Sequence, residues 1–414
     1  MARDFHILTL DGGGAWALIE VMALIDAFGA KTTGHQVLRH FDLIASNSGG
    51  SIVLGGLVTD MPLSVLRDLF VDPTANRRSA LFHRTSFWSD PLSHITQWLA
   101  KVGPKYDARR KRQTIGEILG AYADRPMSSL PGLIGIGEHG REPHVVICGF
   151  DYDINRAKFF RSDLQSLAGS FGAHRDIGLA DAVHSSSEAP VNFFNAPAEV
   201  PQPQTHSARY WDGAVGGYNN PVLAAVIETI ANAARYDTTR DQIKVLSIGT
   251  ASIVLPWSRG APFQDPIFVV QQSKPKLTAD LRKLATSILD DPPDVASFHA
   301  HVLLSALIPA NSSQVISNGP IVRMNPAIRP LLEPNGRWVA PPGLTNCEFN
   351  SLTLLDMDAV RQWEVALIEK LGKAWLSDQV FNQPIRANGD TLDAEIGHNF
   401  YKDAKQQARA FGLI

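Results

Sequence analysis

The chain has 414 residues, of which 44% are hydrophobic and 19% are charged, and its formal net charge at pH 7 is −3. A chain of this length buries roughly three quarters of the surface that it exposes when unfolded, which suffices for one large domain or two ordinary ones. The composition excludes a disordered, collagenous or coiled-coil protein, the near-neutral charge argues against a global positive field for nucleic acid, and the two cysteines, Cys148 and Cys347, exclude a disulfide scaffold and a four-cysteine zinc site.

Two strand–turn–helix units are expected in the first sixty residues. Each has a short apolar run, then a turn of small residues, then an apolar pattern with helical spacing. The strands are expected over 5–10 and 41–45, and the helices over 15–28 and 51–58. Two such units predict an α/β fold with a parallel sheet.

The later part of the chain continues with both kinds of element. Further strands are expected over 144–150, 157–161, 209–211 and 243–248, and helices from 221 onward, over 354–376 and over 392–411. Residues 256–309 are expected to be helical and rich in loops. No internal repeat is apparent.

Residues 72–143 differ from the rest, because they combine scattered aromatic residues with a basic run and many turn residues. We interpret them as helices and loops inserted over one end of the sheet. Two interpretations of the aromatic residues stay open, a lid that faces lipid or a part of the core. These residues are Phe82, Phe87, Trp88 and Trp98.

The sequence shows no targeting or membrane-spanning segment. Residues 1–4 carry both signs of charge, and no stretch reaches the roughly 20 uninterrupted apolar residues of a spanning helix. Two cysteines fit a reducing compartment. We therefore expect a cytoplasmic protein, and export by a route without a signal stays open.

Ser48 lies in the turn between the second predicted strand and the helix that follows it, in residues 46–50 (Ser-Asn-Ser-Gly-Gly). This is the arrangement of a nucleophile elbow, in which Ser48 has a strained backbone and its neighbours are small so that strand and helix can approach. The helix dipole favours negative charge near Ser48. The alternative is a glycine-rich turn without chemistry.

Three consecutive glycines, Gly12, Gly13 and Gly14, follow Asp11 at the end of the first strand. Backbone N–H groups in such a turn suit an oxyanion, a phosphate or a carboxylate. A dinucleotide site would also need an acidic residue at the end of the second strand, where Ala45 and Ser46 stand instead. The oxyanion interpretation is therefore favoured over a nucleotide, with a purely structural turn as the remaining alternative.

Asp212 ends a predicted strand and precedes Gly213, which places its carboxylate to point out of the sheet into a cleft. An Asp-Gly pair is also a common turn dipeptide.

In this order and context, the motifs at 11–14, 46–50 and 212–214 resemble the patatin-like phospholipase family, and the likeness runs from about residue 5 to about residue 376. Supporting stretches lie at 185–190, 219–221, 246–250 and 321–325. The resemblance implies a three-layer α/β/α sandwich with a mostly parallel sheet, formed by residues 1–376, with 377–414 as a helical C-terminal extension. It also implies a lipid acyl hydrolase with a Ser-Asp dyad.

Carried over by position, Ser48 is the nucleophile, Asp212 is the base, and the N–H groups of Gly12, Gly13 and Gly14 form the oxyanion hole. The expected reaction is hydrolysis of carboxylic esters of glycerophospholipids or related lipids through an acyl-enzyme. Ser46 departs from the usual glycine, and Trp16 stands where many members have arginine. These departures leave one alternative, a lipid-binding protein of the same fold with little or no catalysis.

Other candidate sites have weaker support. Asp181 and His184 stand three apart and suggest a Ser-His-Asp triad as a rival mechanism. His299 and His301 lack a third metal ligand at a recognised spacing and are interpreted as exposed or capping residues, and 290–294 is interpreted as a solvated turn. We expect no metal and no cofactor.

The only dense positive patch is the run 105–112. A solvated start of a helix is the favoured interpretation. The alternative is peripheral docking on anionic lipid through Arg109, Arg110, Lys111 and Arg112, where each basic residue contributes about 1 kcal/mol near the surface.

Overall fold

The computed structural model describes residues 3–72, 106–164, 176–190, 193–201, 207–257, 265–270, 292–305, 316–387 and 394–414. The four aromatic residues of the expected insertion, Phe82, Phe87, Trp88 and Trp98, lie outside these ranges, as do Lys105, Asp290 and Asp291.

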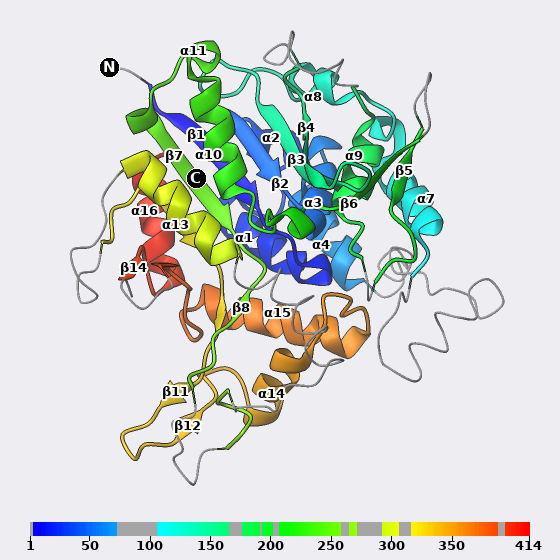
Figure 1. Cartoon of the computed structure of the whole chain (residues 1–414). Coiled ribbons are helices and arrows are strands. Elements are labelled where there is room, and N and C mark those ends of the chain that lie inside the picture. The colour runs from blue at the N-terminus through cyan, green and yellow to red at the C-terminus, as the bar shows by residue number, and fades with distance from the viewer. Residues whose placement is uncertain are drawn as a thin grey trace, which may run out of the picture.

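The centre of the molecule is an eight-stranded sheet in the order β5-β6-β3-β2-β1-β7-β9, with β4 paired to β3 (Figure 1). Its strands are β1 (Phe5–Leu10), β2 (Leu43–Ser46), β3 (His144–Asp151), β4 (Arg156–Arg161), β5 (Ala198–Val200), β6 (Ala208–Asp212), β7 (Ile243–Ile248) and β9 (Ile321–Met324). The run β3-β2-β1-β7-β9 is parallel, and β4 and β6 both run antiparallel to β3. The expected mostly parallel sheet is therefore confirmed.

Alternate side chains of each strand enter two separate apolar cores, because successive residues of a strand point to opposite faces. In β1, Leu8 and Leu10 enter one core, and Phe5 and Ile7 enter the other. The first core is covered mainly by α1 (Leu18–Phe28), α3 (Ser48–Val58), α4 (Leu63–Val71), α9 (Leu179–Ser186) and α15 (Gln362–Leu376). The second is covered by α10 (Val222–Ala231) and α13 (Pro292–Ser305) (Figure 1). The expected three-layer α/β/α arrangement follows.

Shorter elements complete the described chain. The helices are α2 (Gly34–Leu38), α7 (Ala108–Leu119), α8 (Leu130–Ile134), α11 (Ala233–Tyr236), α14 (Asn346–Leu354) and α16 (Tyr401–Ala410), with 3-10 turns at Gly14–Ala17, Gly120–Tyr122, Met127–Ser129, Gly213–Gly216 and Arg240–Gln242. The strands are β8 (Ser252–Ile253), β10 (Ala327–Ile328), β11 (Leu331–Leu332), β12 (Trp338–Val339), β13 (Ile385–Ala387) and β14 (Ala394–Ile396). Within the described ranges, none of these helices combines the length and apolar character needed to span a bilayer.

The two late helices are shorter than the sequence predicted. The pattern over 354–376 is divided, because α14 ends at Leu354 and α15 begins only at Gln362, after an N-terminal capping box between Arg361 and Glu364. The helix predicted over 392–411 is wrong in its first part. There Gly397 has a φ of 106°, which a helix does not allow, and the chain before it forms β14.

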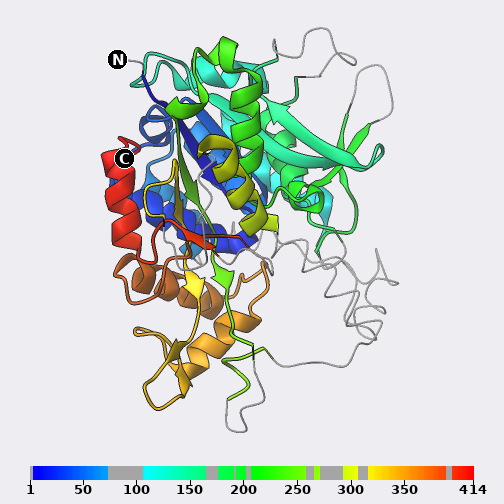
Figure 2. The ribbon, with the colours of Figure 1, turned by 60° about the vertical axis from the view of Figure 1, so that its left-hand side comes forward.

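The C-terminal helix α16 belongs to the same core as the sheet. Tyr401 is buried against Trp375, with ring centroids 4.5 Å apart, and its hydroxyl donates a 2.7 Å hydrogen bond to Asp26 on α1. Figure 2 shows this helix, in red, lying along the side of the molecule. The segment after 376 is thus packed into the fold rather than extended from it.

A buried ion pair holds the start of the glycine loop to two strands. Arg323 on β9 donates to the Asp11 carboxylate at 2.5 Å and to the Ser247 hydroxyl of β7 at 2.9 Å. The side chains of Arg323 and Asp11 are 7% and 4% exposed. Removing one partner would leave the other charge buried without compensation, which costs about 3–5 kcal/mol in comparable pairs.

We expect Arg323→Met to lower the midpoint of thermal unfolding by about 3–6 °C, given that cost and the entropy of unfolding of a chain of this size. The control is Lys370→Met, which breaks the exposed pair of Lys370 with Glu348 and should change the midpoint little. The measurement is differential scanning calorimetry of the three proteins. Equal midpoints for wild type and Arg323→Met would contradict this role.

Candidate active site

Ser48 occupies a sharp turn between β2 and α3. Its φ is 48°, a left-handed value that is uncommon for a residue with a side chain. The turn is held by two hydrogen bonds, one of 2.9 Å from the Ser48 N–H to the Ser186 hydroxyl and one of 2.6 Å from the Ser51 hydroxyl to the Ser48 carbonyl. Ser48 is buried, with 6% of its surface exposed. The backbone therefore has the strained strand-to-helix geometry that the sequence predicted.

The two glycines after Ser48 are required by close backbone contacts. A Cβ on Gly50 would lie 2.5 Å from the carbonyl oxygen of Leu10, and one on Gly49 would lie 2.8 Å from the backbone nitrogen of Gly14. These distances are shorter than van der Waals contact, so α3 can meet the glycine loop only without side chains here. Ser46, two residues before Ser48, is instead a regular β2 residue in register with Leu10. Its hydroxymethyl group is fully buried on one face of the sheet.

Strand β3 brings Asp212 to Ser48. Ser46, the last residue of β2, pairs with Ile147 of β3, and Gly149, two residues further along β3, pairs with Asp212 of β6. Asp212 therefore lies just beyond the end of β2, where Ser48 stands. The Ser48 side chain lies close enough to the Asp212 carboxylate to act on its pKa as a hydrogen-bonding neighbour.

The Asp212 carboxylate is oriented by two further donors. Its Oδ1 atom accepts hydrogen bonds of 2.9 Å from the Asn47 side-chain amide and of 2.9 Å from the backbone N–H of Ala214. Asp212 is 2% exposed. Burial raises the pKa of Asp212 above its ordinary value, and the hydrogen bonds from Ser48, Ala214 and Asn47 oppose that rise.

The glycine loop lies against Ser48, but one of its three N–H groups is already used. The N–H of Gly12 donates a 2.7 Å hydrogen bond to the carbonyl of Asn219, and the carbonyl of Gly12 accepts one of 2.7 Å from the Thr250 hydroxyl. The Gly12 N–H, predicted as an oxyanion donor, is therefore already engaged by the segment at 219. Gly13 and Gly14 remain as candidate donors. Gly14, with a φ of 57°, lines the same pocket as Ser48.

The pocket beside Ser48 is mostly apolar. It is lined by Gly14, Ser48, Gly49, Ile52, Lys111, Ser187, Ala189, Phe193, Phe194 and Met357. Such a wall favours apolar contacts next to the hydroxyl.

Trp16, which departs from the arginine of the resembled family, helps to close this pocket. Its indole N–H donates a 3.2 Å hydrogen bond to the carbonyl of Asp356, and the N–H of the neighbouring Ala15 donates one of 2.9 Å to the carbonyl of Met357. The late turn at 356–357 is thereby held against the glycine loop.

Sequence reasoning missed Asn47, Ser186 and Lys111 as neighbours of the dyad. Asn47 lies inside the elbow motif, and Ser186 lies in the stretch 185–190 that supported the family resemblance, so both motifs carried a signal. Lys111 was wrong as a membrane contact. It lies on the buried face of α7 with Ala108, Ile115 and Leu119, and is 2% exposed.

The rest of the basic run divides in two. Arg109 and Arg110 are exposed, in keeping with a solvated helix start. Arg112 bonds Asp181 at 2.7 Å and lies 3.6 Å from Asp124.

The rival triad is not assembled around Asp181. The imidazole of His184 lies 3.3 Å from the carboxylate of Glu188, and the carboxylate of Asp181 is held by Arg112. Burial lowers the pKa of His184 well below its ordinary value. The titratable side chain that acts as a hydrogen-bonding neighbour of Ser48 is an aspartate, Asp212.

The histidines considered as metal ligands have different environments. His299 is exposed, as expected, whereas His301 is fully buried, which the sequence did not predict. In the described part of the chain, no group of three or more histidine, cysteine, aspartate or glutamate side chains is placed to hold a metal ion.

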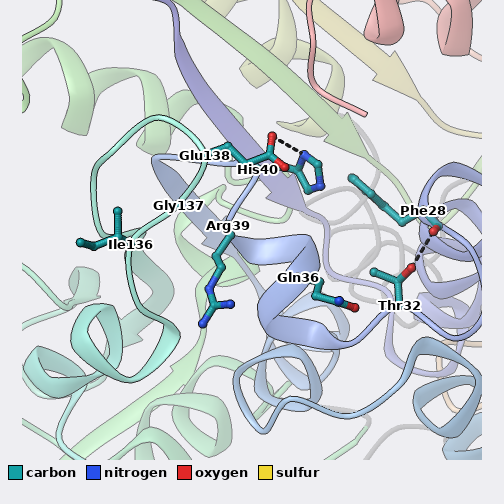
Figure 3. A pocket seen from close by; sticks show the side chains of 8 residues that line it. All are labelled: Phe28, Thr32, Gln36, Arg39, His40, Ile136, Gly137 and Glu138. Carbon is teal, nitrogen blue, oxygen red and sulfur yellow. Dashed lines mark hydrogen bonds and ion pairs between the residues drawn. The ribbon is translucent and has the colours of Figure 1, made fainter.

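A second pocket lies at the opposite, amino end of the parallel strands (Figure 3). It is lined by Phe28, Thr32, Gln36, Arg39, His40, Ile136, Gly137 and Glu138. Two polar contacts are drawn there: His40 contacts the Glu138 carboxylate at 3.1 Å, and the Thr32 hydroxyl donates to the carbonyl of Phe28 at 2.6 Å. This pocket shares no residue with the one beside Ser48.

Residues 8–226, more than half of the chain, match the model of the family described as patatin-like phospholipase. With the three-layer fold and the serine turn, this match shows that the chain belongs to the patatin-like phospholipase family.

Two relatives are each named cGAMP-activated phospholipase. The one from Pseudomonas aeruginosa (strain BWHPSA011 / Pa011) is 24% identical over 249 residues, which are 60% of this chain and 63% of that protein. The one from Escherichia coli (strain TW11681) is 24% identical over 251 residues, which are 59% of this chain and 62% of that protein. The chain thus spans less than two thirds of the length of these relatives.

Among solved structures, VipD from Legionella pneumophila is similar with a TM-score of 0.33 and 11% identity, covering 99% of this chain and 74% of that chain.

We expect Gly50→Ala to destabilise the protein by about 1–3 kcal/mol, because the added methyl group meets the backbone carbonyls of Leu10 and Asp11. The matched control is Gly132→Ala in α8, where a Cβ meets nothing within 4 Å. Thermal unfolding of both variants checks the difference. A Gly50→Ala midpoint equal to that of the control would show that the turn tolerates a side chain.

Proposed function

We propose that this protein is a serine hydrolase that cleaves carboxylic ester bonds of lipids, with Ser48 as nucleophile and Asp212 as general base. The observation that carries the proposal is the placement of the Ser48 side chain, on a strained turn, next to the buried Asp212 carboxylate and beside an apolar pocket. Family membership and the printed names of the two relatives, both phospholipases, support a lipid substrate.

The proposed reaction begins with proton transfer. A free serine hydroxyl is a weak nucleophile, and a neighbouring base activates it. As the Ser48 oxygen bonds to the ester carbonyl carbon, its proton passes to Asp212. The tetrahedral intermediate then expels the alcohol or lysolipid, which takes that proton, and leaves an acyl group on Ser48. Water attacks the acyl-enzyme with Asp212 again as base, and releases the fatty acid and the free serine.

The negative charge of the intermediate needs donors close to Ser48. The N–H groups of Gly13 and Gly14 are proposed for this role, since that of Gly12 is bonded to Asn219. Removal of one such donor costs roughly 2.7–4 kcal/mol of transition-state stabilisation in a related type of site. The N-terminus of α3, which begins at Ser48, adds a favourable dipole.

The substrate we propose is a glycerophospholipid or a related lipid. The side chains of Ile52, Phe193, Phe194 and Met357 offer an apolar wall to its acyl chain. The exposed Arg109 and Arg110 are proposed to attract an anionic lipid surface.

We expect Ser48→Ala and Asp212→Asn each to lower turnover of a nitrophenyl ester and of phospholipid vesicles by at least about 1,000-fold. Ser129→Ala, at a half-buried position outside the pocket, and Asp153→Asn, at an exposed one, are matched controls with wild-type turnover expected. Fatty-acid release is measured with and without cGAMP, because the relatives are named as activated by it. A fluorophosphonate should label Ser48 and not the Ser48→Ala variant.

Unchanged turnover in the Ser48 or Asp212 variant would remove that residue from the mechanism. A wild-type protein that binds lipid vesicles without turnover under either condition would favour the alternative, a lipid-binding protein of this fold.

The pH dependence of kcat/KM should show an acid limb that reports Asp212. The base acts only when ionised, and burial raises its pKa above the ordinary value of 3.8, so activity should fall as the pH drops through that raised value. Turnover of a soluble ester is measured across the acid range, with recovery at neutral pH as the control for unfolding. A profile that stays flat down to pH 3.8 would contradict Asp212 as the base.

A further inference from the structure

A lysine–glutamate ion pair is buried beside the proposed dyad. The ammonium of Lys111, on α7, contacts the carboxylate of Glu188, and their side chains are 2% and 0% exposed. The ammonium also lies 3.3 Å from the carbonyl of His184 and 4.1 Å from the centre of the Phe194 ring. Lys111 lines the same pocket as Ser48.

Stability alone does not explain such a pair. Removing two charges from water costs several kcal/mol each, and well-packed apolar residues of similar volume often give equal or higher stability. The buried face of α7 is otherwise made of Ala108, Thr114, Ile115, Ile118 and Leu119, so an apolar residue at 111 would continue it. A role in the chemistry of the neighbouring pocket accounts for a charge at this position.

The segment that holds Lys111 is bonded to both members of the dyad. The carbonyl of Glu188 accepts a 2.9 Å hydrogen bond from the N–H of Asp212, and the hydroxyl of Ser186 accepts one of 2.9 Å from the N–H of Ser48. The ammonium of Lys111 is tied to this segment through His184 and Glu188. Its position relative to Asp212 is therefore set by short, buried contacts.

We propose that Lys111 is a positioning residue that keeps Asp212 ionised for proton abstraction, with Glu188 holding its ammonium in place. The inference rests on the proposed function, in which Asp212 is the base. A fixed positive charge in a poorly solvated pocket favours a nearby carboxylate over its neutral acid. The charge of Lys111 accordingly opposes the rise that burial causes in the pKa of Asp212.

Other charged or titratable groups surround these residues, and among those that the structure describes none replaces the ammonium. His184 is kept neutral by burial, which lowers its pKa, and burial raises the pKa of the Cys148 thiol on β3, so it is neutral as well. Arg112 is bonded to Asp181 on the outer side of α7. Asp107, at the N-terminus of α7, acts on Glu188 with a negative charge.

The test compares Glu188→Gln with the double variant Lys111→Met, Glu188→Gln. The two proteins differ only at position 111, and the double variant has a neutral pair with no unpaired buried charge. We expect the acid limb of kcat/KM in the double variant to lie about 0.5–1 pH unit above that of Glu188→Gln. In Glu188→Gln, which keeps the ammonium, the limb should lie at or below its wild-type position.

A purely structural role predicts a different result, in which both variants lose activity but share the wild-type acid limb, and this would overturn the proposal. Thermal unfolding checks that each variant is folded. Should the methionine variant not fold, Lys111→Gln with Glu188→Gln makes the same change of charge with a hydrogen-bonding pair. If the wild-type protein shows no turnover that depends on Ser48, the proposed function and the inference fail together. If the enzyme is active but the acid limb of kcat/KM is the same in both variants, only the inference fails.

Discussion

The left-handed backbone at Ser48 depends on three chain segments that meet with almost no side chain between them. A residue with a Cβ at a φ of 48° costs about 1–2 kcal/mol, and such a conformation persists only where its surroundings enforce it. Here Gly50 contacts the end of β1 and Gly49 contacts Gly14. Because α3 can approach the glycine loop so closely, Ser48 is presented at the carboxyl end of the sheet, between the loop and Asp212.

Two buried ion pairs lie next to this site, and each joins segments that are far apart in the chain. Arg323 bonds the aspartate that opens the glycine loop, and Lys111 bonds the glutamate whose carbonyl accepts the N–H of Asp212. Buried pairs of this kind add little net stability, but they strongly penalise an arrangement in which the partners separate. They therefore favour a single relative placement of loop, turn and carboxylate, which the proposed proton transfer from Ser48 to Asp212 requires.

Much of this arrangement could be predicted from the sequence, because it rests on local patterns. The strand–turn–helix units, the strained serine and the mostly parallel sheet follow from apolar runs and small residues at short spacing. The bond from the Gly12 N–H to Asn219 could not be predicted, since the two residues are over two hundred positions apart. The break at Gly397 was also missed, because the residues after it have helical spacing and the φ of a glycine is not encoded by composition.

The burial of Lys111 shows that a run of basic residues can contain a residue of the buried, apolar face of a helix. Four consecutive basic residues suggest a solvated stretch, yet Ala108, Ile115 and Leu119 recur at helical spacing with Lys111 among them. A lysine on the apolar face of a helix needs a buried acceptor, and a glutamate that is fully buried elsewhere needs a buried donor. The sequence contains both the lysine and the glutamate, but only the tertiary fold brings them together, by placing α7 beside the end of α9. An apolar stripe interrupted by one charge is therefore an indication of a buried pair, and here that pair lies on the wall of the pocket that contains the serine.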